Sequence, residues 1–159
     1  MTPILPFRLK VPGTDVFRGL HAVSTSFRFR GFLRLEGHAL TIEWGGVAQV
    51  QDVGALTIRD DRLALPEERI IVPVSHLYRA TLDGGWWRPR LTLQATELGA
   101  LAMVPSEEHG MVRFWYARAD RTVAIAMAAA LSHAIAAASL PGTSPPPSGP
   151  LIGESANTP

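Results

Sequence analysis

Five histidines are the residues of this chain best suited to metal or acid–base chemistry, and their spacing supports neither. They lie far apart, without the short intervals of metal-binding motifs: His21, His38, His76, His109 and His133. The densest group, Glu107-Glu108-His109, is flanked by Ser106 and Gly110, which predicts a solvated turn. The chain contains no cysteine, and no GxSxG, P-loop or GxGxxG motif occurs. We therefore predict no catalytic residues, no metal and no cofactor.

Arginines form the first candidate binding surface. The first 34 residues hold five arginines and one lysine against a single aspartate. Arg28, Arg30 and Arg34 occupy alternate positions of a strand-like run, so they are expected on one outward face, which Arg8, Lys10 or Arg18 would extend. Such a face suits anionic lipid head groups or an acidic protein. The alternative is a solvated strand face whose charges oppose aggregation.

Trp86, Arg88 and Arg90 form the second candidate. In the segment WWRPRLTLQ, strand alternation sends these three side chains to one face and Trp87 to the other. An outward tryptophan beside arginines is typical of interface hot spots and of aromatic anchors at membrane surfaces. The alternative is that both tryptophans cover the end of a barrel, because large aromatics are seldom left exposed.

Short strands must position these side chains. From Phe27 to Trp44 the pattern predicts a hairpin about Glu36-Gly37, which pairs Leu33 with Leu40 and Arg30 with Glu43. Its apolar face is expected to be buried and its arginine face exposed.

The next stretch is less distinct. A hairpin about Asp60-Asp61 is predicted, and Pro73 indicates an edge strand or a bulge. In total, the pattern indicates about seven to nine short strands.

One helix closes the domain. Asp120 is the predicted N-cap, alanine dominates the interior, and Pro141-Gly142 ends the helix. An apolar stripe predicts packing on the sheet: Val123, Met127, Leu131, Ile135 and Ala138. Residues 122–140 contain no charged side chain, so a membrane span is the competing interpretation, although the run consists mainly of weakly apolar alanine.

Length and composition bound the organisation. The 159 residues amount to about one domain, and 47% hydrophobic and 18% charged residues are typical of globular proteins. We expect an extended lead-in over residues 1–25 that could add an edge strand, a folded domain over 26–140, and a disordered Pro/Ser/Gly-rich tail over 141–159.

Charge and the N-terminal sequence bear on partners and location. The formal net charge is only +1, which argues against nucleic-acid binding. The N-terminus lacks the pattern of a signal peptide, so a cytoplasmic location is predicted, with the inner face of the membrane as a peripheral alternative.

Residues 68–138 resemble the second half of bacterial pleckstrin-homology-like (PH-like) domains. The resemblance rests on RIIVPVSHLYRATL, on Trp86-Trp87 followed by RPRL, on Val104-Pro105, and on ARADRTVAIAMAAAL opening the last helix. It implies a mainly β fold with one C-terminal helix, in which two nearly orthogonal antiparallel sheets form a partly open barrel that the helix caps. The family has no invariant catalytic motif, and its bacterial members bind diverse ligands.

The expected function is therefore a non-catalytic PH-like binding module. The first hypothesis is protein interaction or self-association through Trp86, Arg88 and Arg90. The second is a peripheral membrane module that binds anionic lipid head groups through the arginine face. The third is a small enzyme or ligand carrier that uses the barrel mouth.

Overall fold

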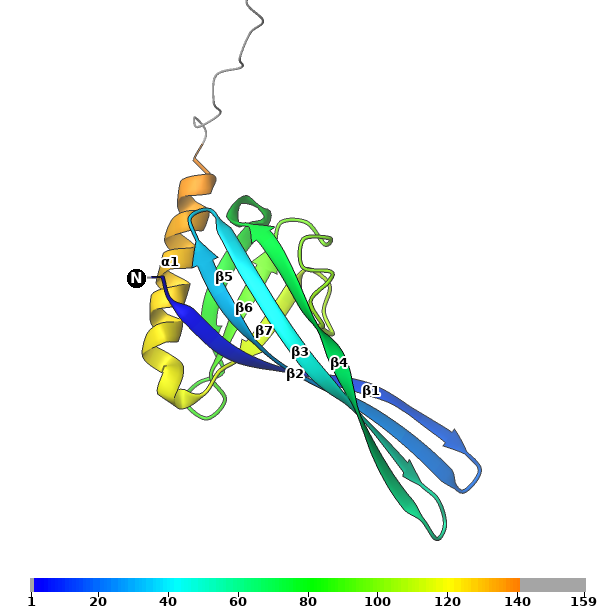
Figure 1. Ribbon diagram of the computed structural model, residues 1–159. Coiled ribbons are helices and arrows are strands. Elements are labelled where there is room, and N and C mark those ends of the chain that lie inside the picture. The colour runs from blue at the N-terminus through cyan, green and yellow to red at the C-terminus, as the bar shows by residue number, and fades with distance from the viewer. Residues whose placement is uncertain (1, 141–159) are drawn as a thin grey trace, which may run out of the picture.

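The computed structural model describes residues 2–140 and consists of seven strands followed by one α-helix (Figure 1). The strands are β1 (Ile4–Arg18), β2 (His21–Glu36), β3 (Ala39–Val53), β4 (Ile58–Pro73), β5 (Leu77–Asp83), β6 (Arg90–Ala95) and β7 (Met111–Trp115). Two 3-10 turns, Val74–His76 and Arg118–Asp120, precede β5 and helix α1 (Arg121–Ala138). The expected mainly β fold with a single C-terminal helix is confirmed.

The strands form one antiparallel sheet in the order β4-β3-β2-β1-β7-β6-β5, and this sheet is not closed. The junction between its halves is narrow, because β1 pairs with β7 only through Arg8 and Trp115. A division into two orthogonal sheets is not established. Residues 4–18, expected in an extended lead-in or an edge strand, instead form an interior strand between β2 and β7.

The β2–β3 hairpin turns one residue later than predicted. Glu36 pairs with Ala39, so Gly37 and His38 fill the turn, and Gly37 has a φ of 57°. Glycine adopts positive φ without strain, which suits it to the first central position of a two-residue turn. The register therefore shifts by two residues, and Leu33 pairs with Ile42 rather than Leu40. A shift of two preserves both faces of a strand, so the predicted apolar and arginine faces are confirmed.

The β3–β4 hairpin corrects a second expectation. Its turn lies at residues 54–57, where Gly54 N–H donates to the Thr57 carbonyl at 2.8 Å. Strand β4 then extends to Pro73, with a shift in its register to β3 between Leu65 and Glu68. Asp60, predicted in a turn, pairs with Gln51 inside the strand, and its carboxylate accepts a hydrogen bond from Gln49 Nε2 at 3.0 Å. Pro73 ends an edge strand, as predicted.

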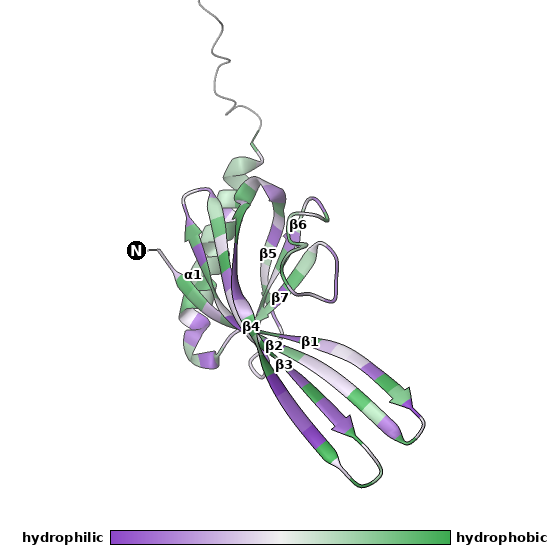
Figure 2. Cartoon of the chain, turned by 45° about the vertical axis from the view of Figure 1, so that its right-hand side comes forward, coloured by the Kyte–Doolittle hydropathy of each residue, from purple (hydrophilic) through white to green (hydrophobic). Residues whose placement is uncertain are grey.

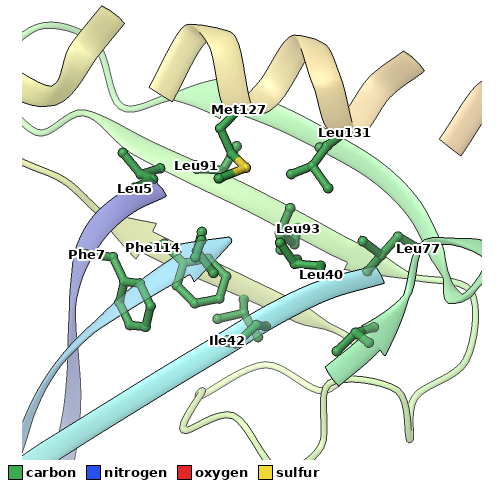
Figure 3. Packing of buried hydrophobic residues seen from close by; sticks show 14 of the residues in the cluster. Leu5, Phe7, Leu40, Ile42, Leu77, Leu91, Leu93, Phe114, Met127 and Leu131 are labelled. Atoms are coloured by element: carbon green, nitrogen blue, oxygen red, sulfur yellow. The ribbon is translucent and has the colours of Figure 1, made fainter. Parts of the chain in front are cut away.

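Helix α1 packs across β5 and neighbouring strands over a single hydrophobic core (Figure 3). Met127 and Leu131 of the helix are fully buried in this core. Within it, the Phe7 ring meets the Phe114 ring edge-on, with ring centroids 4.7 Å apart. Residues 118–138 satisfy the length and hydropathy of a membrane span, but the buried stripe shows the helix acting as a core element. Asp120 occupies the N-cap without a side-chain capping bond, and the expected tail, 141–159, lies outside the described residues.

The outer parts of β1–β4 project beyond the body that the helix covers (Figure 1). We call residues 11–26 and 47–64, which form these two hairpin ends, the arm. At its base the strands approach too closely for side chains: a Cβ on Gly31 would lie 1.9 Å from the Glu43 carbonyl oxygen and 2.7 Å from the Phe7 ring. Glycine at this position therefore allows the sheet to bend out of the body.

Candidate anion-binding groove

An open groove of about 980 Å³ lies where the arm leaves the body. Strands β1 to β4 contribute one wall, and residues from the β5–β6 turn and the end of β7 contribute the other. Six cationic side chains line it: Arg8, Lys10, Arg28, Arg30, Arg62 and Arg88. Trp115 and Gln49 are also part of the lining, and no carboxylate is. Two smaller pockets, of about 380 and 160 Å³, differ from this groove because glutamates as well as arginines line them.

The strand register forces like charges together. Arg8 is the direct cross-strand partner of Arg30, and Lys10 is the partner of Arg28, so four cations form a block on one face of β1 and β2. Like charges placed directly opposite each other destabilise a sheet. On the far side of Arg30, strand β3 supplies Gly45, which has no side chain to offset the repulsion. The fold therefore carries an electrostatic cost that a bound anion would relieve.

Within the described residues, no ion pair neutralises the cations that line the groove. Within residues 2–140, none of the six groove cations lies within ion-pair distance of a carboxylate. Some arginines elsewhere are paired: Arg59 Nε lies 3.2 Å from Asp61 Oδ2, and Arg69 Nε lies 3.4 Å from Glu43 Oε1. Others also have no carboxylate of residues 2–140 within ion-pair distance, namely Arg18, Arg79, Arg118 and Arg121, but they do not line the groove. The positive charge of the groove is thus uncompensated by the protein.

The first predicted surface is divided by the structure. Arg28 and Arg30 line the groove, but Arg34 does not, because its guanidinium contacts Glu36 Oε1 and Glu43 Oε1, each at 3.3 Å. The predicted pairing of Arg30 with Glu43 is wrong. The two-residue register shift moves Glu43 away from Arg30 and leaves that arginine free.

The second predicted surface is also divided, because residues 84–89 form a turn rather than a strand, and strand alternation does not apply to them. The Trp86 ring contacts the Trp87 ring in a tilted arrangement, with centroids 4.3 Å apart, and lies under the Arg118 guanidinium at 4.4 Å. The two indoles remain 56% and 69% exposed, so they do not cover a barrel end. Arg88 alone of the predicted set reaches the groove.

Arg90 lies beside the groove and contacts residues that form one of its walls. It pairs with Asp83 across β5 and β6, and the other oxygen of this carboxylate accepts a hydrogen bond from Thr92 Oγ1 at 2.7 Å. The Arg90 guanidinium also lies over the Trp115 ring, 5.4 Å from its centroid. This network fixes one wall of the groove. Burial raises the pKa of the adjacent Tyr116 hydroxyl above its usual value.

Arg62 and Trp115 line the groove but were not among the predicted site residues. Arg62 is brought to the groove because β4 continues through the predicted turn and places it opposite Gln49. Trp115 reaches it because β7 lies beside β1, which is a pairing between distant segments. Only a correct strand register would have identified either residue.

The groove offers positive charge and hydrogen-bond donors. In the described part of the chain, no three His, Asp or Glu side chains come together as a metal site. The lining itself contains no carboxylate, histidine or hydroxyl that could act as a base or nucleophile. Compared with protein-family models, curated proteins and solved structures, the chain matches none of them. The assignment of a function therefore rests on the geometry of the groove.

Proposed function

We propose that this protein is a non-catalytic, peripheral membrane module whose groove holds the anionic head groups of lipids. The observation that carries the proposal is the set of six unpaired cations around one concave surface without a carboxylate. Each lysine or arginine near an anionic membrane surface contributes about 1 kcal/mol of attraction. Four or more such side chains acting together suffice for salt-sensitive binding.

The tryptophan pair favours a membrane over a soluble anion. Trp86 and Trp87 lie in the same turn as Arg88, and Arg118 stacks on them. Exposed indoles beside cations are typical of the membrane–water interface, where the ring contacts the head-group region and the cation contacts phosphate. A membrane surface accommodates the groove and the indoles together.

The fold and location belong to the same proposal. The meander β1 to β4, followed by β5 to β7 and one C-terminal helix, supports a PH-like domain whose narrow β1–β7 junction would separate two sheets. In such a domain the groove would face the inner surface of the membrane.

A protein-interaction or self-association role remains the second candidate. The exposed, adjacent indoles of Trp86 and Trp87 favour it, because tryptophan is enriched at interface hot spots.

The test is co-sedimentation of the full chain with vesicles of neutral phosphatidylcholine, and with vesicles that also contain phosphatidylglycerol, at low and high salt. We expect capture only by the anionic vesicles, and release at high salt because the charges are screened. The variant Arg28→Glu with Arg30→Glu should weaken capture at least about thirtyfold, since it reverses two charges in the groove.

The matched control is Arg79→Glu with Arg121→Glu. Both arginines are exposed and lie outside the groove. Because this variant also replaces two arginines with glutamates, the change in net charge is the same. This variant should bind nearly as well as the original chain. Equal losses in the two variants would show a dependence on net charge alone and would overturn the groove assignment. Absence of capture by either kind of vesicle would favour a protein partner.

A further inference from the structure

The arm ends in unusually apolar turns. Leu20 and Leu56 occupy the turns of the two hairpins and are 82% and 98% exposed. Turns normally carry glycine, asparagine, aspartate or serine, which hydrogen-bond locally or tolerate the tight backbone. Phe17 and Ile58 beside these turns are also largely exposed. Figure 2 shows hydrophobic segments, with hydrophilic ones beside them, at the free ends of both hairpins of the arm.

The two turns form one surface. Strands β2 and β3 pair up to Ala22 and Val53, so the hairpin ends lie side by side. One row of apolar cross-strand partners lies at the end of the arm, with one residue from each strand: Phe17, Ala22, Val53 and Ile58. On the first hairpin the pair of Arg18 and His21 lies one position beyond this row. Together with Leu20 and Leu56, this row is called the apolar tip.

The apolar tip continues the groove face. Cross-strand partners point to the same side of a sheet, and alternate residues along a strand share that side. Ala22 and Arg28 are six residues apart on the uninterrupted part of β2, so they share a face and lie about 20 Å apart. One side of the arm therefore presents cations at its base and exposed apolar side chains at its end.

A lipid bilayer is the partner that satisfies both ends of this face, because its head groups supply anions and its interior accepts apolar side chains. Behind the tip row the strands carry carboxylates: Asp52 lies in the next row, on the opposite face, and Asp15 and Asp60 lie in the row after it, on the groove face. Carboxylates are costly in hydrocarbon, so they limit entry to the tip row and the turns beyond it. The predicted contact is shallow.

We infer that the apolar tip inserts into the outer part of the bilayer while the groove holds anionic head groups, so that the arm lies along the membrane. This inference rests on the proposed membrane function and adds a second, hydrophobic contact to it. The tip accounts for affinity that does not depend on salt, whereas the groove accounts for affinity that does.

The absence of cysteine allows a label at a single chosen position. The test uses the full chain with Leu56→Cys, and separately Leu20→Cys, labelled with an environment-sensitive fluorophore. Ser75→Cys is the control, because Ser75 is exposed in the turn after β4, at the end of that strand opposite the arm. On anionic vesicles, labels at the tip should shift to shorter wavelength and be quenched by nitroxide-labelled lipid. The control label should do neither.

A second variant, Leu20→Ser with Leu56→Ser, should bind vesicles about tenfold more weakly or worse, with an unchanged dependence on salt. Both side chains are exposed, so folding should be unaffected. Tip labels that keep an aqueous spectrum on vesicle-bound protein would overturn the inference and leave the proposed function standing. Absence of vesicle binding would overturn both. An original chain that dimerises without lipid, through contacts that the leucine variant loses, would assign the tip to a second copy.

Discussion

Charge reversal at Arg30 should stabilise the protein while it weakens anion binding. Arg30 faces Arg8 across β1 and β2, and its direct partner on β3, Gly45, has no side chain to offset the repulsion. The variant Arg30→Glu converts this like-charge pair into an opposite-charge pair. A residue kept for binding rather than for folding is expected to show this opposition between stability and function.

The magnitude follows from the exposure of the pair. Cross-strand charge pairs contribute about 0.2–1 kcal/mol, and both arginines are exposed, so solvent screening favours the lower half of the range. Removing a repulsion and adding an attraction should therefore raise the free energy of unfolding by about 0.5–1 kcal/mol. For a domain of this size the corresponding rise in Tm is about 1–4 °C.

The control lies on the same face of the same strand. Arg34 contacts Glu36 and Glu43, so Arg34→Glu should lower the free energy of unfolding by a similar amount and leave vesicle capture nearly unchanged. Thermal and urea unfolding at low salt measure both variants. At 1 M salt both shifts should shrink, because the screening length falls to about 3 Å. An Arg30→Glu variant that is less stable than the original chain at low salt would refute the argument that the groove cations repel one another.

Two further outcomes test the fold around the groove. In urea unfolding, Gly31→Ala should destabilise the protein by more than about 2 kcal/mol, because the added Cβ would overlap a main-chain carbonyl of β3 and the Phe7 ring. The control Gly99→Ala should be nearly neutral, because no atom lies within 4 Å of the added Cβ. Because the pKa of Tyr116 is raised in the folded protein, the unfolded chain releases the proton of this hydroxyl more readily. The contribution of Tyr116 to stability is therefore complete below about pH 10 and is lost as pH rises through the folded pKa. Tyr116→Phe should lack that alkaline loss in urea unfolding between about pH 9 and 11, whereas Tyr78→Phe should retain it; an unchanged profile in Tyr116→Phe would contradict the assignment.

Local sequence patterns predicted the elements that depend on neighbouring residues. Alternation along β2 placed Arg28 and Arg30 on an exposed face, and the apolar stripe of α1 placed Met127 and Leu131 in the core. A period of two or of 3.6 residues relates side chains to a face of their own element, whichever element packs against it. For this reason the faces were correct even where the turn at Gly37 was displaced by one residue.

Tertiary structure alone decided which charges are free. Arg34 was expected to join Arg28 and Arg30, but it contacts Glu36 on its own strand and Glu43 on β3, while the groove gains Arg62 from β4 and Trp115 from β7. These outcomes depend on strand register and on contacts between segments far apart in the chain, and a single sequence carries little local signal for either. The sequence thus determined which side chains point outward, and the register of the folded sheet determined which of them remain unpaired and converge on a site.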